Sequence, residues 1–327
     1  MPDPEHVKKL AYQLAHRTKP QVYIETGVLV VLALTALIGN SCVLYVFYKS
    51  PRLRNVTNYY LITLAISDIV FALTVMPLSV ANSTHGRDVV GHSVGQVSGF
   101  ICLSLIYGSL QTTSLIAVNR FFCVVKPLVY RKYFKPKPAI LMIVGSWILS
   151  VSFVAVVYFG GLGTFLFYPG RFVYFLASHN VIAIRVFTAL SHITFIIYPM
   201  LMTAICYWKV YQIVKRHETS VSTSMNNGDS QNYPSLSREE IHVTKSVLAL
   251  VCGFVVCWIP CSTTLHIAVY ISIPRYAEMI ITYTAFASSA LNPFVFNIFN
   301  KPFRKEFFRI FSVKKTKVGS SSQHDLP

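Results

Sequence analysis

Long stretches without a charged side chain alternate with short basic clusters along this chain of 327 residues. A helix that crosses the hydrocarbon core of a bilayer needs roughly 20 predominantly apolar residues, and seven stretches are long enough. Their apolar positions do not alternate with a period of two, which argues against the strands of a membrane barrel. The pattern predicts an all-α membrane protein in which seven transmembrane helices form one bundle. The predicted spans are residues 26–48, 58–80, 97–122, 139–160, 186–210, 243–268 and 279–300.

Composition and charge support a membrane location and predict its orientation. The chain is 54% hydrophobic and 13% charged, against roughly 25% charged residues in a soluble domain. Most of its 29 lysines and arginines fall in segments that lie inside if the N-terminus lies outside, as the positive-inside rule requires. We therefore expect a multi-pass protein of the plasma membrane with an extracellular N-terminus. This topology and attraction to anionic membrane lipid explain the net charge of +17 better than nucleic-acid binding does.

The segments outside the spans differ in composition. Residues 1–24 lack the apolar core and the small-residue cleavage site of a signal peptide, so the first span is expected to serve as an uncleaved anchor. A polar linker poor in aromatic residues is predicted to be flexible. After the seventh span, basic and aromatic residues alternate at helical spacing, which is typical of an interfacial helix. The predicted organisation is an extracellular N-terminus (1–25), a bundle (26–300) with a flexible intracellular loop at about 216–238, an amphipathic helix on the inner leaflet (301–311) and a cytoplasmic tail (312–327).

Three features concern the outer side of the bundle. All seven cysteines lie in or at the ends of spans, so no extracellular disulfide is expected. Asn82 begins an Asn-Ser-Thr sequon that falls outside, which predicts a glycan on this residue. The aromatic and glycine-rich segment 160–178 is expected to lie back on the bundle as a lid.

Polar residues and prolines within the spans indicate function and irregular helices. Asp68 is the only acidic residue deep in a predicted span, and a central carboxylate costs about 2.5–3.5 kcal/mol on insertion scales. We expect it to form an ion or proton site that faces the bundle interior; the alternative is a satisfied polar contact with Asn40. Pro77 and Pro199 are expected to kink or bulge their helices.

Each span also carries a motif, and together the motifs resemble those of the rhodopsin-like (class A) G-protein-coupled receptors, from about residue 26 to residue 311. One such motif has little specificity, whereas seven in order at the correct spacing are highly specific. They assign no subfamily and identify no ligand. The matching residues are Gly39-Asn40, Leu64-Ala65 with Asp68, Arg120, Trp147, Pro199 with Tyr207, Phe254 with Cys257-Trp258 and Pro260, and Asn292-Pro293.

The resemblance implies a receptor that converts extracellular ligand binding into outward movement of the sixth helix and activation of a heterotrimeric G protein. Arg120 would pair with Glu240 in the inactive state, and the movement would expose Arg120 and Tyr207 to the G protein. Arrestin and a receptor kinase would act at the tail. The aromatic switch, about which the sixth helix would pivot, consists of Phe254, Trp258 and Pro260.

The resemblance also implies an allosteric sodium ion in the inactive state and no other cofactor. Carboxylate, amide and hydroxyl oxygens are the ligands that suit a hard cation. A retinal Schiff base at the seventh-helix position is ruled out because residues 279–300 contain no lysine. The residues that match the sodium site are Asp68, Ser109, Ser288 and Asn292.

Three positions depart from the family pattern. Asn119 replaces the usual acid before Arg120, which removes one counter-charge, weakens the inactive lock and predicts appreciable basal signalling. Phe296 replaces the tyrosine of the usual Asn-Pro-x-x-Tyr motif and cannot join a water bridge to Tyr207, which would weaken the active state instead. Gly95 occupies the spacing of the usual cysteine at the outer end of the third span, so the disulfide tether of the outer loop is missing.

The outer half of the bundle provides the candidate ligand pocket. Cys102 stands where amine receptors of this family place an aspartate, so a biogenic amine is not expected. The apolar surroundings favour a small, mostly uncharged extracellular ligand. His192 has an alternative role as a core histidine bonded to a neighbour. The candidate pocket residues are Cys102, Ser191, His192, Thr264 and Tyr283, with Trp258 as the floor.

Other classes of function fit less well. A transporter or channel would predict inverted repeats or several charges near the membrane midplane, and Asp68 is the only such charge. No nucleophile–base pair or metal-binding constellation indicates an enzyme. A receptor-like protein that is constitutively active, or that acts without signalling as a dimer partner, remains an alternative because of Asn119, Phe296 and the missing disulfide.

Overall fold

The computed structural model describes residues 4–53, 55–178, 180–227 and 238–311, with the side chains of 214, 216–227, 238–251 and 299 outside the described set. The described part is helical apart from one two-stranded sheet. Its elements in chain order are α1 (Pro4–Ala15), α2 (Lys19–Lys49), η1 (Pro51–Leu53), α3 (Val56–Thr74), α4 (Met76–His85), α5 (Gly91–Val125), α6 (Pro127–Tyr133), α7 (Pro136–Phe159), β1 (Thr164–Tyr168), β2 (Val173–Ala177), α8 (Val181–His192), η2 (Ile193–Ile197), α9 (Tyr198–Asn227), α10 (Arg238–Tyr270), α11 (Arg275–Phe299) and α12 (Lys301–Phe311).

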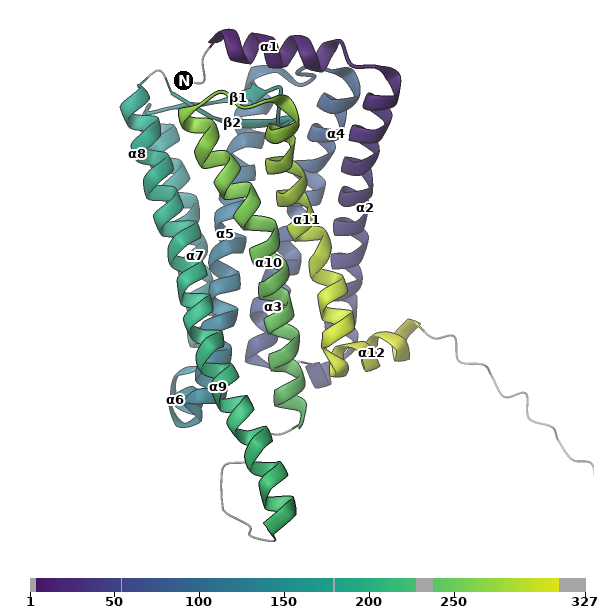
Figure 1. The fold of residues 1–327 in the computed structure, drawn as a ribbon, viewed down its shortest axis with the longest axis vertical. Coiled ribbons are helices and arrows are strands. Elements are labelled where there is room, and N and C mark those ends of the chain that lie inside the picture. Colours follow the sequence, from purple (N-terminus) through teal and green to yellow (C-terminus); the bar gives the residue numbers. More distant parts are fainter. Residues whose placement is uncertain (1–3, 54, 179, 228–237, 312–327) are drawn as a thin grey trace, which may run out of the picture.

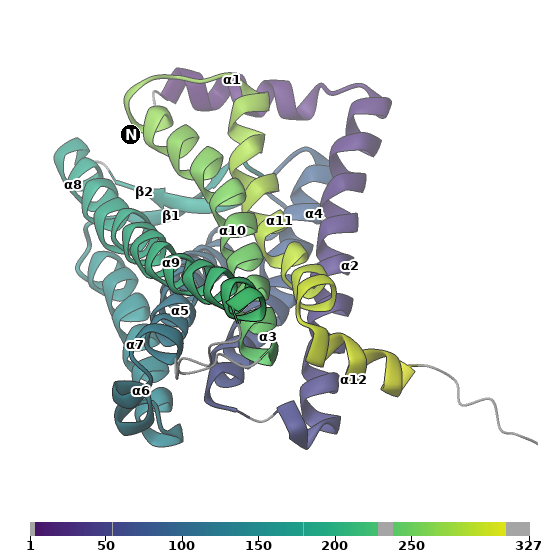
Figure 2. The ribbon, with the colours of Figure 1, turned by 60° about the horizontal axis from the view of Figure 1, so that its bottom comes forward.

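Seven helical segments of the described chain are long and apolar enough to cross a membrane, and they coincide with the seven predicted spans. They run side by side as one bundle, with α1 and the β-hairpin across one end and α6 and α12 at the other (Figure 1 and Figure 2). These ends are called the α1 end and the α12 end. The prediction of an all-α, multi-pass membrane protein is confirmed.

Two spans are irregular at the expected prolines. Proline has no backbone N–H, and its ring clashes with the carbonyl group four residues earlier. Pro77 lies in the first turn of α4, and α3 ends just before it at Thr74. Pro199 follows the π-helical turn η2, a bulge that separates α8 from α9. Pro260 lies within a continuous α10.

A β-hairpin crosses the α1 end of the bundle. Its strands β1 and β2 pair antiparallel over their full length. Phe165 and Tyr174 share one face of the hairpin and are buried against α5, where they contact Gly99 and Gly95. The prediction that this outer segment lies back on the bundle as a lid is confirmed.

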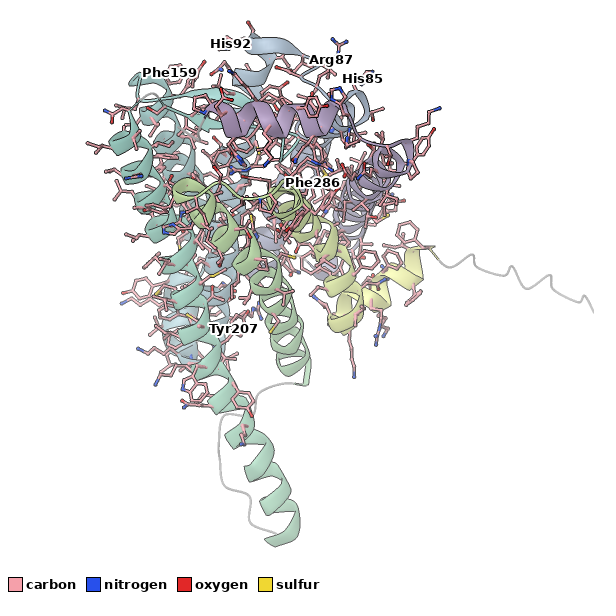
Figure 3. The ribbon with its side chains drawn as sticks, turned by 45° about the horizontal axis from the view of Figure 1, so that its top comes forward. His85, Arg87, His92, Phe159, Tyr207 and Phe286 are labelled. Atoms are coloured by element: carbon pink, nitrogen blue, oxygen red, sulfur yellow. The ribbon has the colours of Figure 1, made fainter. Side chains whose placement is uncertain are left out.

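The N-terminal helix α1 was not predicted from the sequence. Leu10 and Leu14 lie four residues apart on one helical face, and each is 1% exposed. Leu14 packs in the same apolar cluster as Phe172, which follows the turn of the hairpin. Helix α1 therefore lies across this end of the bundle as a second layer above the hairpin, as Figure 3 shows from that end.

The first span begins earlier than predicted because Thr18 caps it. The Thr18 N–H donates to Oε1 of Gln21 at 2.9 Å, and the Gln21 N–H donates to Oγ1 of Thr18 at 3.4 Å. This reciprocal capping box satisfies two backbone donors at the helix start. Helix α2 consequently starts at Lys19.

At the α12 end, α9 continues to Asn227, so the first part of the loop predicted to be flexible at 216–238 is helical. The rest of that loop and the predicted tail lie outside the described residues. Helix α12 confirms the predicted amphipathic helix after the seventh span. It is held by a hydrogen bond of 2.7 Å from Ser50 to Glu306 and by the buried ring of Phe303.

Candidate functional site

A buried carboxylate lies in the middle of the bundle. Asp68 of α3 is 2% exposed, and the Asn292 side-chain amide of α11 donates to its Oδ2 at 2.7 Å. The side chain of Ser289 lies near this carboxylate. Among the described residues, no lysine, arginine or histidine forms an ion pair with Asp68. The charge is therefore balanced only by polar groups.

The two serines predicted to join Asp68 make other bonds. Ser109 Oγ lies 3.1 Å from Ser67 Oγ, and Ser288 donates to a backbone carbonyl of its own helix at 2.7 Å. Ser289, one residue along α11, is the serine of that helix whose side chain lies near the carboxylate. Consecutive helical residues point about 100° apart. Packing of α11 against its neighbours decides which of the two serines faces the carboxylate, and sequence spacing does not reveal this.

The alternative contact between Asp68 and Asn40 is wrong. Asn40 donates to the carbonyl oxygens of Ala36 at 2.8 Å and Ser289 at 3.0 Å, so it ties α2 to α11. A buried charge without an ionic partner is costly, and the oxygen atoms gathered around Asp68 suit a hard cation. The residues present therefore fit a sodium ion.

A second buried site lies at the α12 end of α5. Arg120 and Asn119 are both buried. Asn119 does not bond to Arg120; its Oδ1 accepts a hydrogen bond of 2.8 Å from Thr57, which ties α5 to α3. The residue that replaces the family's usual acid thus has a structural role. The side chain of Glu240, the expected partner of Arg120, lies outside the described residues.

The aromatic residues of the predicted switch are buried along α10 and α11. The rings of Phe254 and Trp258 lie 5.7 Å apart. Phe296 packs at 6.3 Å from the Phe303 ring, in the apolar cluster that also holds Tyr207. The buried Tyr207 hydroxyl has no hydrogen-bond partner among the described residues, as expected where a phenylalanine replaces the family's tyrosine.

Close helix contacts at two of the motifs depend on glycine: Gly39 is itself a motif residue, and Gly108 faces the motif residue Trp147. A methyl group at Gly39 would lie 2.7 Å from the ring of Pro293, and one at Gly108 would lie 2.6 Å from the ring of Trp147. Both distances are shorter than any normal carbon contact, so these helices approach closely because glycine has no side chain. Pro293 and Trp147 therefore act in packing.

A small cavity of about 60 Å³ lies above Trp258. Four predicted pocket residues line it, namely Cys102, Ser191, His192 and Trp258. His192 is also a core histidine, because its Nδ1 lies 2.8 Å from the Thr188 carbonyl oxygen and its Nε2 lies 3.3 Å from that of Ser262. Its predicted alternative role is therefore present in the structure.

Two predicted pocket residues do not line this cavity. Thr264 is one position away from Leu265, whose side chain does line it, and the helical rotation turns Thr264 aside. Tyr283 points toward α2 instead, and its hydroxyl donates to the Glu25 carbonyl oxygen at 3.2 Å. These two predicted pocket residues therefore lie outside this cavity.

A larger cavity of about 500 Å³ lies at the α1 end, between α1, the hairpin, α8 and α10. Sequence reasoning missed it because α1 and the paired strands form part of its wall. The only signal for it was the aromatic segment that forms the hairpin.

Packing and hydrogen bonds hold the hairpin in place of a disulfide. Methyl groups at Gly95 and Gly99 would each lie 2.5 Å from a hairpin ring, of Tyr174 and Phe165 respectively. Gln96 accepts a hydrogen bond of 3.0 Å from the Phe165 N–H and donates back to the Phe165 carbonyl. The Tyr174 hydroxyl donates to Asp88, and burial together with this bond raises the pKa of Tyr174. None of the seven cysteines, all of which the structure describes, forms a disulfide.

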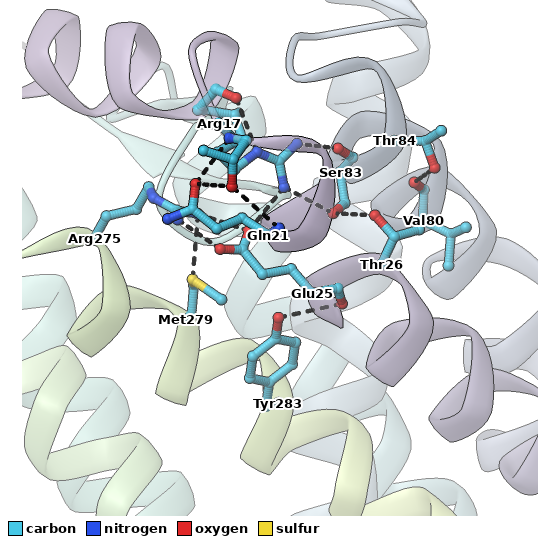
Figure 4. A network of polar contacts seen from close by, with 12 residues as sticks. Arg17, Gln21, Glu25, Thr26, Val80, Ser83, Thr84, Arg275, Met279 and Tyr283 are labelled. Atoms are coloured by element: carbon cyan, nitrogen blue, oxygen red, sulfur yellow. Dashed lines mark hydrogen bonds and ion pairs between the residues drawn. The ribbon is translucent and has the colours of Figure 1, made fainter. Parts of the chain in front are cut away.

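An ion-pair network joins α1 to the bundle (Figure 4). The carboxylate of Glu25 accepts from Arg17 at 2.7 Å and from both terminal nitrogens of Arg275 at 2.6 and 2.8 Å. Arg17 also donates to the Ser83 carbonyl oxygen. The Glu25 carboxylate thus joins α2 to the α1–α2 link and to α11, and Arg17 extends the network to α4.

A glycan on Asn82 is incompatible with this structure. Its side chain is fully buried in α4. The amide donates to the Phe172 carbonyl oxygen at 3.3 Å, and its oxygen accepts from the Val89 N–H at 3.1 Å. The sequon is present, but the Asn82 side chain is buried and its hydrogen bonds help to hold the hairpin.

The chain matches the model of the 7 transmembrane receptor (rhodopsin family) over residues 39–296. It is 26% identical over 298 residues to the GQ-coupled rhodopsin of Mizuhopecten yessoensis, covering 88% of this chain and 59% of that protein. It is also 26% identical over 290 residues to melatonin receptor type 1A of Gallus gallus, covering 86% and 78%. The crystal structure of squid rhodopsin has the same fold, with a TM-score of 0.76 at 21% identity over 90% of this chain and 86% of that one. These relatives are receptors and not enzymes, and this chain belongs to the rhodopsin family of seven-transmembrane receptors.

Proposed function

We propose that the chain is a plasma-membrane receptor, with its N-terminus and α1 end outside, that binds an extracellular ligand and activates a heterotrimeric G protein. The observation that carries this proposal is the buried Arg120 near the α12 end, whose Nε bonds to none of the described residues. Membership of the rhodopsin family supports the same reading of this residue.

Arg120 shares this end of the bundle with other unsatisfied polar atoms. Tyr60 Oη, Tyr207 Oη and Asn119 Nδ2 are also buried and bond to no described residue. A buried polar group that lacks a hydrogen bond costs about 1–3 kcal/mol. Outward movement of α10 would let water or a G-protein segment bond to these atoms. The open state would therefore gain hydrogen bonds that these atoms lack in the closed state.

Trp258 connects the small cavity to this movement. It lines the cavity on one side and contacts Phe254 on the other. Pro260 lies two residues along the helix and supplies no N–H, which leaves a weak point where α10 can bend. A ligand that displaces the Trp258 ring would therefore shift α10 about Pro260.

Ligand-free signalling, measured in cells with a biosensor for each G-protein class, tests this proposal. We expect a basal signal, because Asn119 bonds to Thr57 and supplies no negative charge to Arg120. Arg120→Ala should abolish it at equal surface expression. Glu240→Ala should raise it by removing the acid that would pair with Arg120. Equal signals from the parent and Arg120→Ala would contradict the proposal, and silence in every channel would leave a receptor that signals only with its ligand or a non-signalling dimer partner.

We also propose that Asp68 binds an allosteric sodium ion. Asp68→Asn keeps the size of the side chain and removes its charge, so we expect it to abolish stabilisation by sodium. The thermal midpoint of the purified parent should rise when sodium chloride replaces choline chloride at equal ionic strength. Asp88→Asn, which alters an acid in the outer loop bonded to Tyr174, is the control and should keep the response. A sodium response that survives Asp68→Asn would exclude this site.

Two further partners are proposed for the inner side. Helix α12 would contact the inner leaflet, with the exposed side chains of Phe308 and Arg309 at the lipid surface. Arrestin and a receptor kinase would act on the tail, residues 312–327, which lie outside the described residues.

A further inference from the structure

The larger cavity at the α1 end has the dimensions of a ligand site. Its volume of about 500 Å³ falls within the range of roughly 300–1,000 Å³ typical of ligand pockets. The cavity over Trp258 measures about 60 Å³, too little for such a ligand. The two cavities share Phe175 and Leu265 in their walls, so a molecule in the larger one would lie next to the smaller one.

The charged side chains in the wall of the larger cavity all have the same sign. Arg171 and Arg185 line it together with His6, and none of the described lining residues is an aspartate or a glutamate. The other lining residues are largely apolar, among them Ile184 and Val269. A cation would be repelled by Arg185, and an anion would gain from the Arg185 guanidinium and from the terminal nitrogens of Arg171, whose charge Glu278 balances.

Arg171 is held rigidly in this wall. Its side chain is 4% exposed, and its Nε donates to the buried Glu278. The guanidinium carbon lies 4.2 Å from the centre of the Tyr168 ring and 4.7 Å from that of Phe175. The two terminal nitrogens make no hydrogen bond to a described residue. A guanidinium fixed in this way binds an anion with little further loss of side-chain freedom.

Arg185 and His6 add polar groups to the wall. Arg185, on α8, forms no ion pair with any described residue, and its guanidinium carbon lies 5.4 Å from the Tyr270 ring centre. The Nε2 atom of His6, on α1, is buried and bonds to none of the residues that the structure describes. Both side chains would gain from an anionic oxygen placed between α1 and α8.

We infer that this cavity binds an amphiphile with an anionic head and an apolar chain. The head would lie among Arg171, Arg185 and His6, and the chain along the apolar wall toward Phe175 and Leu265. This differs from the mostly uncharged ligand expected from the sequence, because the sequence placed neither arginine at the pocket. The site's role in signalling rests on the proposed function, whereas its binding chemistry does not.

The surroundings of the cavity favour an amphiphile over a soluble anion. The residues that flank its α8 and α10 walls include exposed apolar side chains at Val181 and Ile271. Helix α1 and the hairpin form another part of its wall. A ligand that reaches the cavity between α8 and α10 would come from the outer leaflet. Both a free fatty acid and an anionic phospholipid have an anionic head and an apolar chain, and both can reach the cavity by this route.

Binding of radiolabelled oleate to the purified full chain in phosphatidylcholine nanodiscs tests this inference, with empty nanodiscs as the blank. We expect saturable oleate binding and no saturable binding of oleyl alcohol, which has the same chain without the charge. Arg185→Gln should weaken oleate binding at least tenfold. Arg87→Gln removes the same charge from an exposed outer position away from the cavity and should leave binding unchanged. Ala268→Phe should block binding by filling the cavity, without altering any charge.

Several outcomes would overturn the inference. They are equal binding of oleyl alcohol, equal loss in Arg87→Gln and Arg185→Gln, or full binding by Ala268→Phe, each in variants with the parent's thermal midpoint. Competition by phosphatidylglycerol added to the nanodiscs would identify a phospholipid as the source; no competition would identify a free carboxylate. A chain that binds oleate but activates no G protein would contradict the proposed function and leave this site standing. A chain that signals yet binds neither amphiphile would refute this site alone.

Discussion

Replacing Glu278 with alanine is expected to destabilise the protein by about 3–5 kcal/mol, because it leaves Arg171 buried without its ionic partner. The two side chains are 1% and 4% exposed, so water cannot replace the lost carboxylate without opening the structure. For a chain of this size we expect a fall of roughly 4–7 °C in the thermal midpoint of the purified protein.

Two comparisons separate the effect of the unpaired Arg171 charge from a general loss of stability on mutation. The double variant Arg171→Met with Glu278→Leu removes both charges and should recover most of the loss, because an apolar pair of similar size needs no partner. Glu5→Ala breaks the exposed pair with Lys8 and should change the midpoint little. If the double variant were less stable than Glu278→Ala, the Arg171–Glu278 pair would contribute more to stability than the neutralisation of two buried charges.

Glu25→Ala is expected to release α1 from the bundle. The carboxylate of Glu25 is shared by Arg17 and Arg275 (Figure 4), and its loss leaves two largely buried guanidinium groups facing each other. We expect a destabilisation of about 3 kcal/mol or more. Backbone hydrogen exchange should become faster in residues 4–15 than in the core of α5.

Thr26→Val is the matched control for this network. It removes only the hydrogen bond of 2.9 Å between Thr26 and Ser83, so exchange in α1 should stay close to that of the parent. Unchanged protection of α1 in Glu25→Ala would mean that Leu10 and Leu14 hold the helix by apolar packing alone.

Much of the fold follows from local physics that a sequence reveals. Uncharged stretches of sufficient length locate the seven spans because a bilayer imposes that length. Pro77 and Pro199 locate the helix irregularities because a missing N–H acts on the adjacent turns. Asp68 and Asn292, more than 200 positions apart, meet as the family resemblance implies.

The remaining features depend on tertiary contacts that no local pattern encodes. Thr264 and Tyr283 lie on the expected helices, but packing sets the rotation that turns each away from the cavity. Asn82 begins a sequon, yet its amide donates a hydrogen bond to the hairpin and is not available to a glycan. Gly95 in the sequence indicates that the usual cysteine, and with it the disulfide tether, is missing. Only the structure shows that contact between Gly95 and Tyr174 holds the hairpin instead.

The most direct test of receptor function is the distance between spin labels at Arg52→Cys and His242→Cys, which lie in η1 and in the first turns of α10. The exposed or partly exposed Cys42, Cys123 and Cys252 would be replaced by serine. We expect nucleotide-free G protein to shift the distance distribution to longer values, and Arg120→Ala to prevent the shift. An unchanged distance in a chain that binds the G protein would contradict outward movement of α10.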